Sequence, residues 1–219
     1  YQGASSKFDA MPSAGCKQRS EAAEPPHTTH VTAADKEGNV VAMTQTLNWA
    51  FGACTVVPGT GVLLNNCQVL FDPRPGQVLS PEPGKRPTSS MAPTLVLRPN
   101  GEPMLAIGKI GGTRIFPSVL QIILNLIDHK MPLQKALNAP LMWSRGGALE
   151  LERRVAGYVE EELRCRGYEI LFRDAIGGGA SAVHCAEDGI LSGACCWRAD
   201  GHAVAMSGGE MSAEVEPHF

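Results

Sequence analysis

Apolar and polar residues alternate over short runs in the first half of the chain, a pattern typical of half-buried strands. Pairs of such runs flank clusters of turn-forming residues, so the pattern predicts two hairpins. Their strands are residues 31–35 with 40–46, and residues 94–97 with 104–107. A short continuous apolar run at residues 61–64 predicts one more strand, and a buried one.

The period changes to that of a helix after residue 114. Apolar residues then recur on one helical face and predict a largely buried helix over residues 115–129. Shorter helices are predicted at residues 133–138 and 154–166, and three further strands at residues 169–172, 180–185 and 190–196. Strands followed by helices and then by strands again favour the α+β class, with helices packed on antiparallel sheet.

Residues 1–27 lack either period and are rich in Ser, Ala, Pro, Gly and charge. We therefore expect a flexible, propeptide-like tail or linker at residues 1–27 and one folded domain over residues 28–219.

Composition narrows the function classes. The 219 residues are 43% apolar and 19% charged, the balance of an ordinary globular protein. A formal net charge of -3 argues against a nucleic-acid partner, and no apolar stretch reaches the roughly 20 residues of a membrane helix. The seven cysteines include no CxxC pair and suggest neither a zinc site nor a complete disulfide framework. We expect most of them to be buried.

Thr28 begins the ordered pattern with the run Thr28-Thr29-His30. The β-propensity of threonine alone accounts for this start of a strand. The alternative is cleavage of the chain before Thr28, which would give one residue both a nucleophilic hydroxyl and a free α-amine to serve as its base. An α-amine titrates near pH 8, within reach of physiological pH.

Several blocks of sequence, in order, resemble the small catalytic subunit of the γ-glutamyltransferases. They begin with the run TTHVTAADKEGN at residues 28–39, and the others are TQTLN, FG, GVLLNN, KRPTSSM, GGTRI and NAP, at residues 44–48, 51–52, 61–66, 85–91, 111–115 and 138–140. The resemblance implies the αββα four-layer sandwich of N-terminal-nucleophile hydrolases, of which this chain is the catalytic half. It also implies self-cleavage before Thr28 and a reaction without metal or organic cofactor.

The resemblance also implies roles for individual residues. Thr28 would attack an amide carbonyl, Thr46 would hold the Thr28 hydroxyl, and backbone amides of a glycine pair would bind the oxyanion. The residues concerned are Thr28, Thr46, Gly111 and Gly112 for catalysis, and Asn48, Ser89 and Ser90 for substrate binding. Arg114, which follows the glycines, is expected to form a structural ion pair.

The family also implies a large subunit, from the same precursor or as a separate chain, that supplies an arginine for the substrate carboxylate. Two positions depart from the family pattern: Cys67 replaces a glutamine, and Leu70 replaces an aspartate that contacts the substrate α-amine. The expected activity is hydrolysis or transfer of a γ-glutamyl-type acyl group. The alternatives are an acylase for glutaryl-type amides without an α-amine, and a catalytically silent structural or binding member of the family.

Overall fold

The computed structural model describes residues 27–206. It begins with a hairpin of β1 (Thr28–Ala34) and β2 (Val40–Thr46), whose register places Thr28 opposite Thr46. Both strands alternate between half-buried and exposed residues, as the sequence pattern predicts. The Asp35 carboxylate accepts the backbone N–H groups of Glu37 and Asn39, and so closes the turn between the strands.

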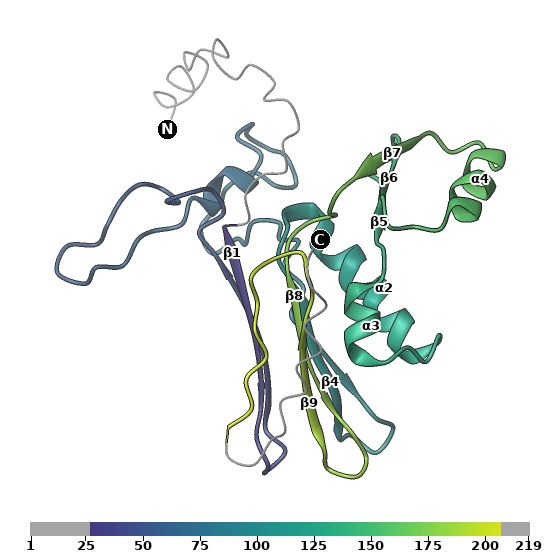
Figure 1. Cartoon of the computed structure of the whole chain (residues 1–219). Coiled ribbons are helices and arrows are strands. Elements are labelled where there is room, and N and C mark those ends of the chain that lie inside the picture. Colours follow the sequence, from purple (N-terminus) through teal and green to yellow (C-terminus); the bar gives the residue numbers. More distant parts are fainter. Residues whose placement is uncertain (1–26, 207–219) are drawn as a thin grey trace.

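A four-stranded antiparallel sheet has the order β3-β4-β8-β9, and the β1–β2 hairpin packs on one of its faces. Two helices, α2 (Ile115–Ile127) and α3 (Leu133–Asn138), cover the opposite face, as Figure 1 shows. The described residues therefore form three layers: helices, sheet and hairpin. The strands are β3 (Thr94–Leu97), β4 (Pro103–Lys109), β8 (Ala180–Cys185) and β9 (Leu191–Cys195).

The hairpin approaches the sheet closely where His30 of β1 meets Gly108 of β4. A Cβ atom at position 108 would lie 2.1 Å from the His30 ring, so only glycine fits there. The His30 Nδ1 is 2.7 Å from the Thr44 hydroxyl, and burial lowers the pKa of the ring below its usual value. A neutral imidazole wedged between the layers thus fixes the distance between hairpin and sheet.

The hydrophobic core lies between the four-stranded sheet and the two helices, and includes Leu105, Ile107, Ile122 and Leu137. The helix predicted to be largely buried is amphipathic instead: α2 buries one face and exposes apolar side chains on its outer flank, namely Phe116, Leu120 and Leu124. No helix of the described residues is long and apolar enough to cross a membrane.

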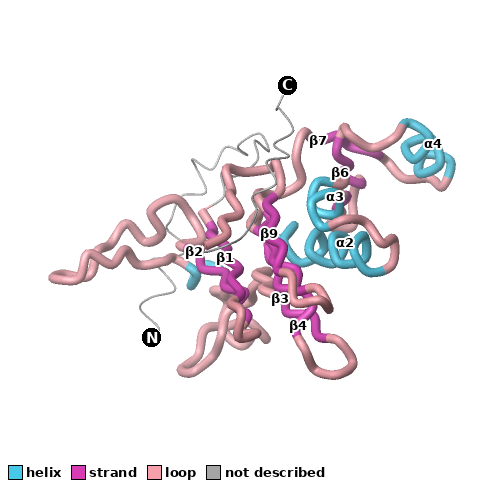
Figure 2. The backbone as a smooth tube through the Cα atoms, turned by 60° about the horizontal axis from the view of Figure 1, so that its bottom comes forward, coloured by secondary structure: helices cyan, strands magenta, loops and turns pink. Residues whose placement is uncertain are grey.

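A smaller sheet lies beyond the helices and carries α4 (Gly157–Cys165), as Figure 2 shows. It consists of β5 (Met142–Trp143), β6 (Leu149–Glu152) and β7 (Ile170–Arg173), with β6 and β7 parallel. The sequence pattern missed β5 and β6. Every residue of β6 is buried, including its two glutamates. In the sequence these glutamates alternate with leucines, a pattern typical of a strand with one face in solvent.

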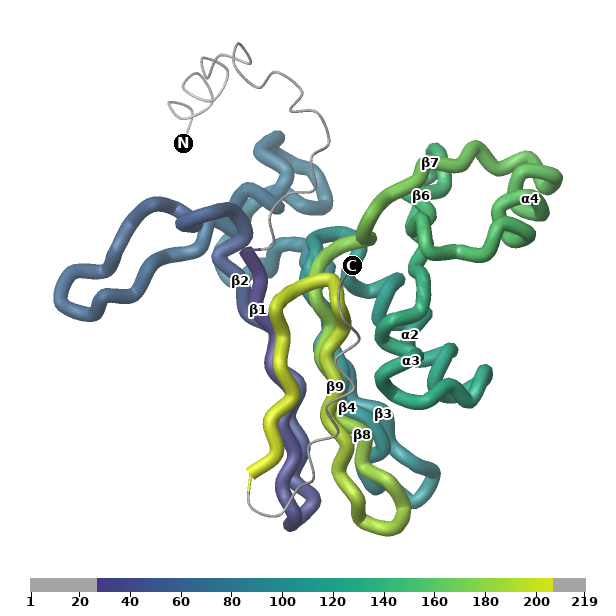
Figure 3. Tube along the Cα trace, in the orientation of Figure 1, coloured from purple at the N-terminus to yellow at the C-terminus, as the bar shows by residue number. Residues whose placement is uncertain are grey.

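Three expectations were wrong in detail. Residues 61–64 form no strand: Leu63 makes one isolated bridge to Val56, and Val62 and Leu64 are exposed on a loop that projects from the hairpin end (Figure 3). The helix predicted from residue 154 begins at Gly157.

Of the six described cysteines only Cys196 is buried, because the others lie on loops, sheet margins or the outer face of α4. The predicted tail lies outside the described residues, except for its last residue.

Candidate active site

Thr28 and Thr46 face each other across the open end of the hairpin, where β1 begins and β2 ends. Their hydroxyl oxygens are 3.0 Å apart, and both side chains are partly buried. The sequence predicted this contact, and the antiparallel register of the hairpin produces it.

The Thr46 hydroxyl has a full set of hydrogen-bond partners. It donates to the His27 carbonyl oxygen, at 3.3 Å, and accepts the backbone N–H of Asn48, at 2.9 Å. A hydroxyl has one proton to donate, so in this arrangement Thr28 is the donor in the Thr28–Thr46 contact. The hydroxyls therefore form a directed chain from Thr28 through Thr46 to the carbonyl of the residue that precedes Thr28.

Asn48 has a positive φ of 72°, which turns the chain sharply after β2. Its side-chain amide donates to Asn66 Oδ1 at 3.0 Å, and the same oxygen accepts the Trp49 N–H at 3.2 Å. The Asn66 N–H in turn donates to Leu47 O at 3.2 Å. These contacts fasten the segment after β2 to the start of η1 (Cys67–Leu70), which carries the two family departures, Cys67 and Leu70.

Gly111 and Gly112 belong to the segment between β4 and α2. This segment lies at the same end of the packed sheets as the start of β1 (Figure 1). Gly111 has a φ of 131° and Gly112 a φ of 59°, values that L side chains rarely adopt. A Cβ at Gly111 would lie 2.6 Å from Gly177 Cα, so the two backbones touch. The pair begins η2 (Gly112–Arg114), where amide N–H groups lack partners within the helix and attract anions.

Of the two predicted substrate-binding serines, Ser90 reaches this glycine pair. Its hydroxyl donates to the Gly112 carbonyl at 2.8 Å. Ser89 instead accepts the backbone N–H of Met91 at 3.2 Å, and its side chain is exposed. The structure thus joins Ser90 to the glycine segment and leaves Ser89 on the surface beside it.

Arg114 forms the ion pair expected of it. Its Nε and Nη2 donate to the two carboxylate oxygens of Glu150, each at 2.9 Å, and its guanidinium stacks over Trp143 at 4.3 Å from the ring centroid. Arg173 also donates to Glu150, at 2.9 Å. Burial opposes ionisation of Glu150, but the hydrogen bonds from both arginines prevail and lower its pKa. The start of α2 is therefore tied to the small sheet.

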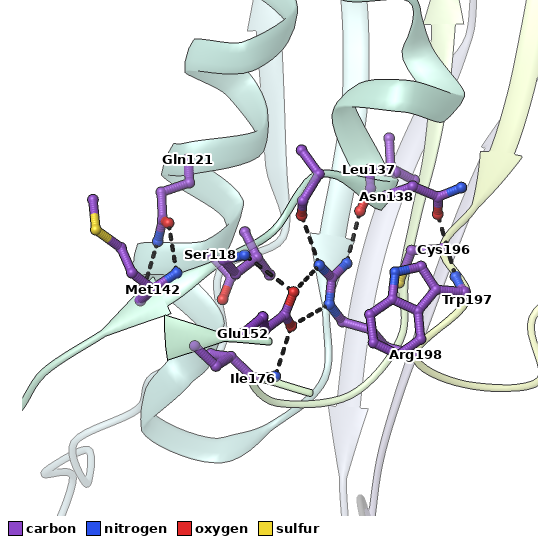
Figure 4. A network of polar contacts seen from close by, with 12 residues as sticks. Ser118, Gln121, Leu137, Asn138, Met142, Glu152, Ile176, Cys196, Trp197 and Arg198 are labelled. Atoms are coloured by element: carbon purple, nitrogen blue, oxygen red, sulfur yellow. Dashed lines mark hydrogen bonds and ion pairs between the residues drawn. The ribbon is translucent and has the colours of Figure 1, made fainter. Parts of the chain in front are cut away.

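A second glutamate of β6 forms an ion pair that the sequence did not reveal. Glu152 and Arg198 are both fully buried, and two hydrogen bonds of 2.6 Å join them in a bidentate contact. Figure 4 shows Arg198 also directed at the helix α3 terminus, where it donates to Leu137 O at 2.8 Å. The remaining Glu152 contacts are backbone N–H groups, from Leu141 at 3.1 Å and Ile176 at 2.8 Å.

Within residues 27–206, no group of three or more His, Cys, Asp or Glu side chains is placed to hold a metal ion. The groups that the structure assembles here are the paired Thr28 and Thr46 hydroxyls, and the backbone N–H groups of the glycine pair lie before α2. Such a set can position a nucleophilic hydroxyl and stabilise a developing oxyanion.

Residues 3–206 match the family model described as gamma-glutamyltranspeptidase. The chain is 52% identical to the acylase ACY 1 proenzyme of Pseudomonas sp. (strain SE83), over 83% of this chain and 32% of that proenzyme. It is 39% identical to the glutathione hydrolase proenzyme of Pseudomonas aeruginosa, over 67% of this chain and 29% of that proenzyme. The chain thus spans about a third of the length of these curated relatives.

Two solved structures share the fold. The gamma-glutamyltranspeptidase from Pseudomonas nitroreducens complexed with L-DON superposes with a TM-score of 0.69 at 34% identity, covering 82% of this chain and 98% of that one. The cephalosporin acylase from Bacillus halodurans superposes with a TM-score of 0.74 at 27% identity, covering 82% of this chain and 34% of that one. The similarity therefore spans nearly the whole of one solved chain and one part of a longer one.

Proposed function

Because this chain belongs to the γ-glutamyltranspeptidase family, we propose that it is the catalytic half of an N-terminal-threonine amidohydrolase or acyltransferase. The observation that carries the proposal is the hydroxyl chain from Thr28 through Thr46 to the His27 carbonyl. These contacts place the Thr28 hydroxyl, held by Thr46, beside the peptide bond that precedes it, which is the arrangement that a threonine attacking that carbonyl requires. The glycine pair at the same end of the sheets supports the assignment.

In the uncleaved chain, Thr28 would act on the peptide bond that precedes it. Its hydroxyl oxygen forms an ester with the His27 carbonyl carbon as the C–N bond breaks, and the Thr28 nitrogen takes up the proton that the hydroxyl loses. The Thr46 hydroxyl, which donates to the His27 oxygen, would stabilise the negative charge on that oxygen. Water then hydrolyses the ester, leaving a carboxylate on His27 and a free α-amine on Thr28.

In the cleaved enzyme the free α-amine would take the proton of the Thr28 hydroxyl as that oxygen attacks a substrate amide. The oxyanion would lie against the N–H groups of Gly111 and Gly112, since close backbone approach and the start of η2 both favour negative charge there. The protonated amine then supplies the proton of the leaving amine. Water, or an acceptor amine, finally attacks the acyl–threonine ester and frees Thr28.

We further propose that a large subunit covers the outer face of the β1–β2 hairpin. This face exposes a row of apolar side chains, including the cross-strand pair Val31 and Met43, which are 46% and 48% exposed. Such a row on a two-stranded sheet usually marks an interface. The layers of the αββα sandwich that are missing from the described residues would lie on this side. The proenzyme names of the relatives agree with two parts cut from one chain.

Met43→Lys should separate the two halves of the processed protein, because it places a charge within the apolar face of the hairpin. Co-purification of the large half with a tagged small half is the measurement, and we expect it to fall by at least tenfold. Tyr158→Lys is the matched control, because Tyr158 is 75% exposed on the distant α4. Equal co-purification of both variants with wild type would place the partner elsewhere.

For the acyl group, a γ-glutamyl-type donor is one candidate and a glutaryl-type donor without an α-amine is the second. Leu70 favours the second, because an ammonium docked beside it would lack the charged partner that the family aspartate provides. Such a partner contributes about 1.5–3 kcal/mol, or roughly one to two decades in affinity. Leu70 is 37% exposed on η1, and its carbonyl accepts a hydrogen bond from the Thr88 hydroxyl. The acylase names of two relatives agree with cleavage of an amide-linked acyl group.

Two 4-nitroanilides that differ only in the α-amine, γ-glutamyl and glutaryl, test both candidates. We expect the processed enzyme to cleave the glutaryl substrate with a kcat/KM about ten- to a hundredfold higher. Leu70→Asp should shift this ratio toward the γ-glutamyl substrate, whereas Val69→Asp, at the exposed neighbouring position, should not. A wild-type preference for γ-glutamyl would select the first candidate, and failure on both substrates would contradict the proposed acyl group altogether.

A further inference from the structure

The last residue of β4, Lys109, is fully buried, and the mechanism above gives it no role. Burial lowers the pKa of Lys109 to about 8. The charge of Arg198 lowers it as well, whereas Cys196 and Glu152 act in the opposite direction. An unpaired buried ammonium is costly, so its position in the core requires a partner. That partner is the carbonyl oxygen of Gly178, which accepts a hydrogen bond from Lys109 Nζ.

Gly178 belongs to the run Gly177-Gly178-Gly179, which leads into β8 and lies directly against the segment before α2. The Gly178 N–H donates to Ile110 O at 2.9 Å, and the Ile110 N–H donates to Gly179 O at 3.0 Å. In a trans peptide the C=O and N–H groups point in opposite directions. The bond from Gly178 to Ile110 O therefore sets the direction in which the Gly111 N–H points.

The approach of the two glycine segments leaves no room for adjustment. A Cβ at Gly111 would lie 2.8 Å from Gly178 N, and a Cβ at Gly177 would lie 3.2 Å from Lys109 Cε. The aliphatic part of the Lys109 side chain thus packs against Gly177, while its ammonium donates a hydrogen bond to the Gly178 carbonyl. The Gly178 carbonyl and the Gly178 N–H belong to successive peptide units joined at Gly178 Cα. A shift of that carbonyl would therefore change the backbone dihedrals of Gly178, move its N–H, and through the bond to Ile110 O turn the Ile110–Gly111 peptide.

We propose that Lys109 is a positioning residue for the oxyanion hole: through Gly178 it fixes the orientation of the Gly111 amide donor. The inference rests on the proposed function, because it gives a purpose to Lys109 only if the Gly111 amide binds an oxyanion. It assigns Lys109 no contact with substrate. Its effect is confined to the transition state, because the orientation of a donor matters most where charge develops.

The test compares Lys109→Met with wild type in the processed two-part enzyme, using whichever anilide wild type cleaves. Methionine keeps an unbranched apolar stem but removes the donor. We expect the rate of 4-nitroaniline release in the first turnover to fall about ten- to a hundredfold, with KM within twofold. The affinity of a boronic acid analogue of the same acyl group, whose tetrahedral adduct on Thr28 is anionic, should fall by a similar factor.

Two further variants separate positioning from folding. Lys109→Gln retains a neutral donor and should recover part of the lost rate, whereas Ile122→Ala, in the middle of α2, should lower the Tm and leave the rate unchanged. A Lys109→Met enzyme with a lower Tm but wild-type acylation and boronate affinity would overturn the proposal. So would failure of both Lys109 variants to yield folded enzyme, which would assign Lys109 to folding. An inactive wild type would instead contradict the proposed function itself.

Discussion

Thr28→Ala should leave the full-length precursor uncut and without measurable amide hydrolysis. The hydroxyl is the proposed nucleophile in both reactions, and the residual rate of enzymes that lack such a nucleophile is about a millionfold below wild type. Intact mass and N-terminal sequencing of the purified protein measure the cleavage. Wild type should yield a new chain that begins Thr-Thr-His, and the variant should not.

Thr29→Ala is the matched control for this experiment. Thr29 is adjacent to Thr28 but points to the exposed side of β1, away from Thr46. We expect it to cleave and to turn over as wild type does. A wild-type chain that folds well and yet stays intact would contradict self-cleavage, and would favour the reading of this chain as a silent structural or binding member of the family.

Arg198→Met should lower the free energy of unfolding by about 3–5 kcal/mol, since it leaves the Glu152 carboxylate buried without its cation. The variant also removes a donor from the Leu137 carbonyl at the end of α3. Urea denaturation measures the loss, in the Thr28→Ala precursor so that partial cleavage does not mix two species. Fluorescence of Trp197, beside Arg198, reports the transition nearest the change.

Two comparisons show whether the loss comes from the unpaired charge. Arg153→Met removes an exposed partner of Asp174, with both side chains largely in solvent, and should cost less than about 1 kcal/mol. The double variant Glu152→Leu with Arg198→Met removes both charges and should be more stable than Arg198→Met alone. A double variant no more stable than the single one would show that the hydrogen bonds to the backbone, rather than the charge, decide the effect.

The sequence located most of the secondary structure because the elements around the core follow simple periods. The elements α3, β8 and β2 were predicted at their observed bounds, whereas β1 begins at Thr28 rather than at the predicted Val31. The pattern failed where burial depends on distant partners. Leu149-Glu150-Leu151-Glu152 alternates like a half-exposed strand, yet all four residues are buried because Arg114, Arg173 and Arg198 neutralise the glutamates.

For the candidate site, the order of short motifs was informative where single residues were not. The resemblance to the family paired Thr28 with Thr46 in advance, and the register of the hairpin places the two residues opposite each other. The same motifs gave Gly111 and Gly112 but not what holds them. Gly178 lies far along the chain from Ile110, and no local period connects them.

The sequence by itself therefore determined the fold class, the family and the pairing of Thr28 with Thr46, because those depend on local periodicity and on motifs of fixed order. Only the tertiary structure decided which charged residues are buried, which serine reaches Gly112, and that Lys109 holds Gly178. These features depend on contacts between segments far apart in the chain. In such contacts a buried polar or charged group destabilises the fold unless it finds a partner, so each hydrogen bond and charge pair is required. The pattern of residues along the chain does not indicate which distant segments will meet.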